Sequence, residues 1–262
     1  MKSLLLLLPL LLASLRPVRA GEGVALQPGE SFTFRVGWGI FDHAGEVKVE
    51  ATADTEAGRA QTRVITYTST QGVIGMLYPF TGEVVAHFDA KDGLLTTARA
   101  TTTAGKKVTR MSVDFDYEHH QAKYVDPLRP ERDAMLAMPP GRPMDLITVL
   151  IQARAWDLKP GATHPALVLF DNEFYPLTIT ARQVEKIDTA TGRRDAMLLT
   201  PAMDGTPKGM FKKGGAIQVW ISNDADRLPL KFTVKTKVGT ATATLTSHQA
   251  PAAAVALTDP PR

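Results

Sequence analysis

Most of the chain alternates between apolar and polar residues, and this pattern limits the possible fold more than any other feature. Between Ser31 and Trp38, the side chains of Phe32, Phe34 and Val36 fall on one face with Trp38, and the polar side chains fall on the other. Period-two alternation of this kind is typical of a half-buried β-strand. The segment is therefore predicted to be a strand, and the chain to be mainly β.

The same alternation predicts further strands along the chain, with turn signals between them. They cover residues 46–53, 59–70, 83–89, 94–103, 106–117, 122–125, 165–170, 175–187, 195–200, 216–221, 228–238 and 240–248. Glycines in Asp92-Gly93, Ala104-Gly105 and Thr191-Gly192 suit the positive φ angles of hairpin turns. Strands joined by such turns are expected to pair antiparallel.

The alternation stops between residues 127 and 160. Five prolines, at 127, 130, 139, 140 and 143, predict a loop that contributes no strand to a sheet. The period then changes over residues 144–157, where apolar residues recur at helical spacing, from Asp145 near the start to the stop signal Lys159-Pro160-Gly161. We expect one main helix there. The apolar segment 73–78 fits either a helical turn or a strand.

One helix cannot cover a large antiparallel sheet. Either the sheet curves until its concave face closes on itself, or that face remains a cavity for an apolar ligand. The expected fold is a curved antiparallel sheet, a half-barrel, with one main helix.

The first 20 residues have the features of a cleavable signal peptide. Lys2 precedes an apolar run over residues 4–15, and Val18 and Ala20 are the small residues that signal peptidase accepts. A membrane anchor would need a longer run without Pro9. We therefore expect a periplasmic or secreted protein with no transmembrane segment in the mature chain, a single β-rich domain over residues 21–248 and a disordered tail over 249–262.

Charge and cysteine content exclude several functions. The leader holds three of the 30 basic residues and none of the 27 acidic ones, so the mature chain would be formally neutral, which disfavours nucleic acid as a partner. The chain has no Cys, so it lacks thiol chemistry, disulfides and a lipid-modified N-terminal cysteine. No nucleophile elbow, zinc-binding His-Glu-x-x-His or phosphate-binding glycine motif occurs, and no catalytic residue, metal or cofactor is predicted.

The run from Asp114 to His120 could place a row of oxygen ligands and an imidazole on one strand face for a divalent cation. The alternative is a solvated face, with residues 118–121 forming a hairpin tip that breaks the register. We favour the solvated face.

Candidate ligand-binding residues lie beside turns. The apolar candidates for the rim of a cavity are Phe170, Phe174, Tyr175, Met210 and Phe211. The last two belong to the basic, glycine-rich loop 208–215, which suits either a lipid surface or a plain solvated hairpin. Asp224 and Arg227 could clamp a polar head group, or they could form a local Asx turn in which Arg227 pairs with Asp224.

Four segments, in order, resemble the bacterial family called domain of unknown function 3108. They are Gly29-Glu30-Ser31-Phe32-Thr33-Phe34 with Trp38 and Ala44-Gly45-Glu46, the turn 89–94, the helix 144–156 with Leu158-Lys159-Pro160-Gly161, and residues 219–224 with Arg227-Leu228-Pro229. The resemblance implies an exported, β-rich envelope protein. Its expected architecture is similar to the curved sheet of the lipoprotein-localisation carriers, whose concave face holds acyl chains, an analogy of fold that does not by itself establish function.

The leading hypothesis is a non-enzymatic envelope protein that binds a lipid or lipid-linked glycan in its concave sheet. An assembly factor that binds another envelope protein, and a hydrolase of envelope glycans with two converging carboxylates, remain as alternatives.

Overall fold

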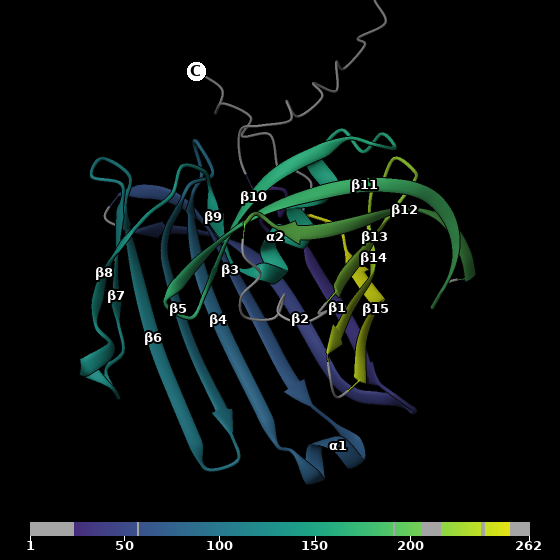
Figure 1. Ribbon diagram of the computed structural model, residues 1–262, viewed down its shortest axis with the longest axis horizontal. Coiled ribbons are helices and arrows are strands. Elements are labelled where there is room, and N and C mark those ends of the chain that lie inside the picture. Colours follow the sequence, from purple (N-terminus) through teal and green to yellow (C-terminus); the bar gives the residue numbers. More distant parts are fainter. Residues whose placement is uncertain (1–23, 57, 191, 206–215, 237–238, 252–262) are drawn as a thin grey trace, which may run out of the picture.

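The computed structural model describes residues 24–56, 58–190, 192–205, 216–236 and 239–251, and these form one curved sheet of 15 strands (Figure 1). The strand order is β8-β7-β6-β5-β4-β3-β2-β1-β15-β14-β13-β12-β11-β10-β9. Strand β9 runs parallel to β10, and the other neighbours pair antiparallel. The end strands β8 and β9 are not paired with each other, so the sheet is open. The predicted fold, mainly β with a curved antiparallel sheet, is confirmed.

Two meanders make up the sheet, joined where the first strand pairs with the last. The first consists of β1 (Ser31–Trp38), β2 (Phe41–Glu56), β3 (Arg59–Thr70), β4 (Phe80–Asp89), β5 (Leu95–Ala104), β6 (Lys107–Asp116), β7 (Gln121–Val125) and β8 (Ala134–Ala137). The second consists of β9 (Pro143–Met144), β10 (Thr163–Phe170), β11 (Glu173–Thr189), β12 (Gly192–Met203), β13 (Ala216–Ser222), β14 (Pro229–Thr236) and β15 (Gly239–Gln249). In Figure 1, β10, β11 and β12 bend over the inner face of the first meander.

The helices are short. The main one, α2 (Leu146–Gln152), begins where the Asp145 carboxylate accepts the backbone N–H of Thr148 at 3.0 Å, and it continues as the 3-10 turn η2 (Ala153–Ala155). The apolar segment 73–78, which fitted either a helical turn or a strand, lies mostly in the helix α1 (Gly72–Leu77). A further 3-10 turn, η1 (Pro130–Arg132), follows β7. The prediction of one main helix near residues 144–157 is confirmed.

The hairpin turns have the expected geometry. Gly93, Gly105 and Gly192 have φ angles of 69°, 59° and 109°, a positive range that favours glycine. Strands β1 and β3 begin and end at the predicted residues, whereas β2 and β11 extend beyond their predicted bounds.

The prediction that the proline-rich segment contributes no strand is wrong. Strand β8 lies between Pro130 and Pro139, and β9 includes Pro143. Both are short and lie at the two edges of the sheet, where a missing N–H or a nearby proline costs no ladder hydrogen bond on the outer side. The prolines therefore confine these strands to the edges instead of excluding them.

The two edges of the sheet meet through side chains. A small buried cluster joins the β6–β8 side to β10 and β11, and consists of Val113, Ala122, Tyr124, Met138, Leu167, Leu169 and Phe174. At its margin, the Tyr124 hydroxyl donates to the Asp171 carboxylate at 3.1 Å, and Arg132 donates to the same carboxylate at 2.6 Å. The larger cluster fills the space between α2 and the central strands. Side-chain packing thus replaces the backbone pairing that would close a barrel.

Three predictions fall wholly or largely outside the described residues: the signal peptide 1–20, the loop 208–215 and the tail 249–262. Of the tail, Gln249 belongs to β15, where it pairs with Ser31, so the predicted boundary is corrected by one residue. None of the helices in the described part of the chain is long and apolar enough to cross a membrane.

Candidate functional site

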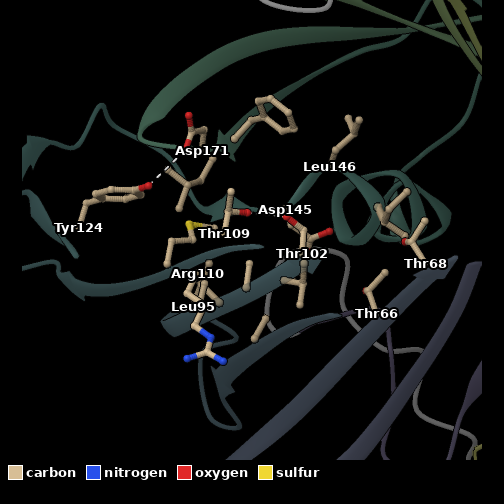
Figure 2. Close-up of a pocket in the computed structure, with 18 of the residues that line it drawn as sticks. Thr66, Thr68, Leu95, Thr102, Thr109, Arg110, Tyr124, Asp145, Leu146 and Asp171 are labelled. Atoms are coloured by element: carbon tan, nitrogen blue, oxygen red, sulfur yellow. Dashed lines mark hydrogen bonds between the residues drawn. The ribbon is translucent and has the colours of Figure 1, made fainter. Parts of the chain in front are cut away.

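A pocket of about 510 Å³ lies over the inner face of β3–β6 (Figure 2). Its roof is formed by Asp145, Leu146 and Ile147 at the start of α2, and by the end of β10 at Leu169 and Phe170. The volume lies within the range of small-molecule sites, which is about 300–1,000 Å³. This pocket is the candidate site.

The floor of the pocket exists because the inward positions of β4 and β5 carry small side chains. Successive rows of paired residues cross β3, β4, β5 and β6. The deepest row is Val64, Ala86, Ala98 and Val113, and the next is Thr66, Val84, Ala100 and Met111. Alanine at the centre of each row leaves space between the sheet and α2 that larger residues would fill. The register of four strands therefore builds an apolar trough.

The trough becomes polar towards the β5–β6 turn. The third row is Thr68, Gly82, Thr102 and Thr109, with the hydroxyl oxygens of Thr102 and Thr109 2.5 Å apart. Lys107 lines the pocket beyond this row. Figure 2 shows Arg110 pointing away from the cavity, as its alternate position on β6 requires. The pocket therefore has an apolar inner part and a polar outer part.

One side of the pocket is basic but internally paired. Asp126 is fully buried, and its carboxylate accepts hydrogen bonds from Arg129 Nε at 2.9 Å and from the Leu128 N–H at 3.2 Å. Arg132 lies 3.6 Å from the same carboxylate and also pairs with Asp171. Two lining arginines are thus held in place by acids, which a buried carboxylate requires.

Two ionisable groups at the pocket have shifted acidities. Burial raises the pKa of Tyr124 to about 12, with a further contribution from the Asp171 carboxylate, so its hydroxyl remains a donor at neutral pH. Loss of hydration raises the pKa of Asp145, against the opposing hydrogen bonds from Thr148. Both carboxylates that line the pocket have structural roles. Asp145 caps the start of α2, and Asp171 holds the contact between the two sheet edges.

Of the apolar residues predicted from sequence, Phe170 lines this pocket and is 50% exposed. Phe174 and Tyr175 are instead buried, Phe174 in the edge-joining cluster and Tyr175 in the main core. Met210 and Phe211 lie outside the described residues. Phe170 and Phe174 lie in adjacent register pairs beside the β10–β11 turn, with Phe170 opposite Glu173 and Phe174 opposite Leu169, a pairing that sequence spacing alone does not reveal.

Asp224 and Arg227 lie away from the pocket. The backbone N–H groups of Asp226 and Arg227 donate to the Asp224 carboxylate at 3.2 and 3.3 Å, which is the expected Asx turn. The predicted pairing partner is wrong, because Arg194 donates to this carboxylate while the Arg227 guanidinium donates to the carbonyl oxygens of Trp156 and Arg154. Burial of Asp224 is outweighed by hydrogen bonds from Ser222 and Arg194, which lower its pKa.

The Asp114–His120 run contains the predicted break in register. Strand β6 ends at Asp116, β7 begins at Gln121, and His119 bonds to Asp116 at 2.8 Å within the exposed tip. Among the described residues, no three His, Asp or Glu side chains gather in a way that could hold a metal ion.

A second pocket, of about 420 Å³, lies on the other side of α2, between Trp156, Ala155 and Gln152 and the β9–β11 edge.

Sequence reasoning missed the residues that form the floor of the first pocket. The available signal was the run Ala98, Ala100 and Thr102 at alternate, inward positions of a predicted strand, where a packed core would have larger side chains.

The fold and pocket define an open, β-barrel-like protein with a cavity beneath its main helix. The chain belongs to the family described as protein of unknown function (DUF3108), whose profile matches residues 33–246. No curated protein matches it.

Among solved structures, the chain is similar to a β-barrel-like protein of domain of unknown function DUF1849 from Brucella abortus. The two are 12% identical, the match covers 85% of this chain and 98% of the other, and the TM-score is 0.54. A structure described as a candidate exported protein with a YmcC-like fold, from Bacteroides fragilis, is also 12% identical, with coverage of 88% and 100% and a TM-score of 0.38. The first likeness shows the fold.

Proposed function

We propose that this protein is an exported envelope protein that binds an apolar or amphipathic molecule, a lipid or lipid-linked glycan, in the pocket over β3–β6. The observation that carries the proposal is the cavity of about 510 Å³, floored by Ala86, Ala98 and Ala100 and left unfilled by the chain's own side chains. The leader-like sequence of residues 1–20 supports export.

The gradient along the trough favours an amphipathic ligand. An acyl chain would lie against the alanine rows, and its binding would release the water that covers their apolar surface. Its polar end would meet the hydroxyl groups of Thr102 and Thr109 and the amino group of Lys107. Within the described chain Lys107 forms no ion pair, whereas Arg129 and Arg132 are already paired with acids. The free cation favours an anionic head group at that end.

The direct test measures uptake of a fluorescent fatty acid by delipidated mature protein, together with native mass spectrometry of protein purified from the envelope. Ala100→Phe places a ring in the trough and should weaken fatty-acid uptake by about tenfold or more. That loss is expected when the ring displaces part of the ligand's apolar surface from contact with the pocket. The matched control is Thr101→Phe, since Thr101 is the neighbouring exposed position on the outer face of β5. The proposal is wrong if the parent protein carries no lipid and takes up no fatty acid, or if both variants behave alike.

The polarity of the pocket has its own test. A fatty acid should bind more tightly than the alcohol of the same chain length, and Lys107→Gln should remove that difference while leaving alcohol binding unchanged. Equal binding of acid and alcohol by the parent would show that Lys107 contributes no head-group recognition.

A further inference from the structure

The end of the sheet that carries α1 has an exposed apolar surface that the pocket does not explain. We call it the apolar tip, and it consists of Ile40, Phe41, Val73, Met76, Leu77 and Tyr78, with exposed fractions of 90%, 39%, 53%, 84%, 64% and 64%. Single exposed apolar residues are ordinary, but six on adjoining elements form a patch of the kind that marks an interaction site.

Hydrogen bonds and ring contacts hold these elements together. The Gln71 N–H donates to the Ala44 carbonyl at 2.8 Å and fixes the start of α1 beside β2. The rings of Trp38 and Tyr78 meet edge to face at 6.5 Å, joining the end of β1 to the end of α1. The tip is therefore a built surface, at the lower edge of Figure 1.

Helix α1 has its polarity inverted. Ile74 is its buried anchor, while Val73, Met76 and Leu77 face outward, where a helix on a protein surface ordinarily carries polar side chains. The segment contains no charged residue that would hydrate this face. Its exposed side thus suits an apolar environment rather than water.

Lysines border the tip. The Gly105 N–H donates to the Pro79 carbonyl at 2.9 Å, which places the β5–β6 turn and Lys106 beside the end of α1. On the other side, the Gly39 N–H donates to the Thr240 carbonyl oxygen, and Thr240 pairs across the sheet with the exposed Lys235 of β14. Lys235 therefore lies near the β1–β2 turn. An acidic residue, Asp42, directly follows Phe41. Neither Lys106 nor Lys235 forms an ion pair with any described residue.

From this arrangement we infer that the apolar tip is a membrane-contact surface, which inserts its apolar and aromatic side chains into the interface of an anionic bilayer while the lysines bind lipid head groups. Aromatic rings beside exposed aliphatic side chains, framed by cations, are what a bilayer interface accepts. Six side chains fall short of the roughly 20 residues per side of a stable protein interface. The surface is independent of the pocket, so it can act whether or not the pocket carries a lipid.

The test is co-sedimentation of the mature chain with vesicles of phosphatidylcholine, alone or mixed with phosphatidylglycerol, at low and high salt. The parent should bind the mixed vesicles more tightly, and salt should weaken that binding. Ile40→Glu/Met76→Glu should reduce the partition coefficient by about 100-fold, because two apolar side chains that would insert into the bilayer are replaced by anions that the anionic lipids repel. Lys106→Gln/Lys235→Gln should reduce it by about fivefold per lysine, and only for anionic vesicles.

The matched control is Met135→Glu/Val184→Glu, which also replaces two exposed apolar residues by acids, on β8 and β11 away from the tip. It should sediment like the parent, and this control and Ile40→Glu/Met76→Glu should both unfold at the parent's urea concentration. The inference is overturned if the parent does not sediment with anionic vesicles, or if the tip and control variants lose binding equally. It is also overturned if light scattering shows a dimer that Ile40→Glu/Met76→Glu dissociates, with no vesicle binding. Fatty-acid uptake should be unchanged in the tip variant, which separates this result from the pocket proposal.

Discussion

Replacing Glu30 by alanine should strongly destabilise the fold, because this carboxylate is 1% exposed and has three partners. It accepts from Arg154 at 2.5 Å, from His248 at 3.0 Å and from the Gln27 N–H at 3.2 Å. The substitution leaves the Arg154 guanidinium with 17% exposure and without its counter-charge.

Breaking a buried ion pair from one side costs about 3–5 kcal/mol. Arg154 keeps a hydrogen bond to the Asp226 carbonyl at 3.3 Å and lies 5.4 Å above the centre of the Phe32 ring, so the lower end applies. We expect the free energy of unfolding to fall by about 3 kcal/mol. In the double variant Glu30→Ala/Arg154→Ala, the loss should be smaller than the sum of the two single losses.

The assay is urea unfolding of the mature chain, followed by tryptophan fluorescence and circular dichroism. The control is Lys159→Ala, which removes the exposed Asp157–Lys159 pair and should leave the unfolding midpoint unchanged. A loss below about 1 kcal/mol for Glu30→Ala, or strictly additive single losses, would refute the assignment of Glu30 as a buried ionic anchor.

Three further outcomes are expected. Gly45→Ala should lower the free energy of unfolding by about 1–3 kcal/mol, because the added methyl group would collide with the Ser69 carbonyl oxygen. Gly82→Ala would meet only side-chain atoms, of Phe80 and Thr102, and should lower it less in the same urea titration. Asp224→Asn should lower the unfolding midpoint at neutral pH, since the carboxylate stabilises the fold only when it is ionised. The difference from the parent should disappear as the pH falls below the unfolded-state pKa of Asp224, about 3.9, and through its lower folded-state pKa. Asp171→Ala removes the hydrogen bonds between the β10–β11 turn and the β7–η1 edge, so amide hydrogen exchange there should accelerate while β1 and β2 exchange at the parental rate.

The strands were predictable because their inner and outer faces differ strongly in polarity, as in β1 and β3. The edge strand β8 was not, because four residues between prolines carry too short a pattern to outweigh the turn signals. Its pairing with β7 comes from the folded edge rather than from local preference.

The pocket floor and the burial of Glu30 were not predicted from the sequence, for a different reason. The trough depends on the register of four strands, which brings Ala86 beside Ala98 only after pairing. Glu30 is a charged residue directly before a strand, a position where the side chain is ordinarily exposed. Its burial depends on Arg154, 124 positions further along the chain. Local patterns contain no information on contacts at that separation, whereas the Asx turn at Asp224 was predictable because its partners are two and three residues away.

The seam between β1 and β15 has a consequence for biosynthesis. Thr246 donates to the Thr33 carbonyl across 213 positions, so the first strand gains its second neighbour only when the last one has been made. Throughout translation the nascent chain presents β1 as a bare edge, open to pairing with other chains. A chaperone that shields this edge would raise the yield of folded protein, and a ribosome that stops before residue 239 would release a product whose two meanders cannot be joined.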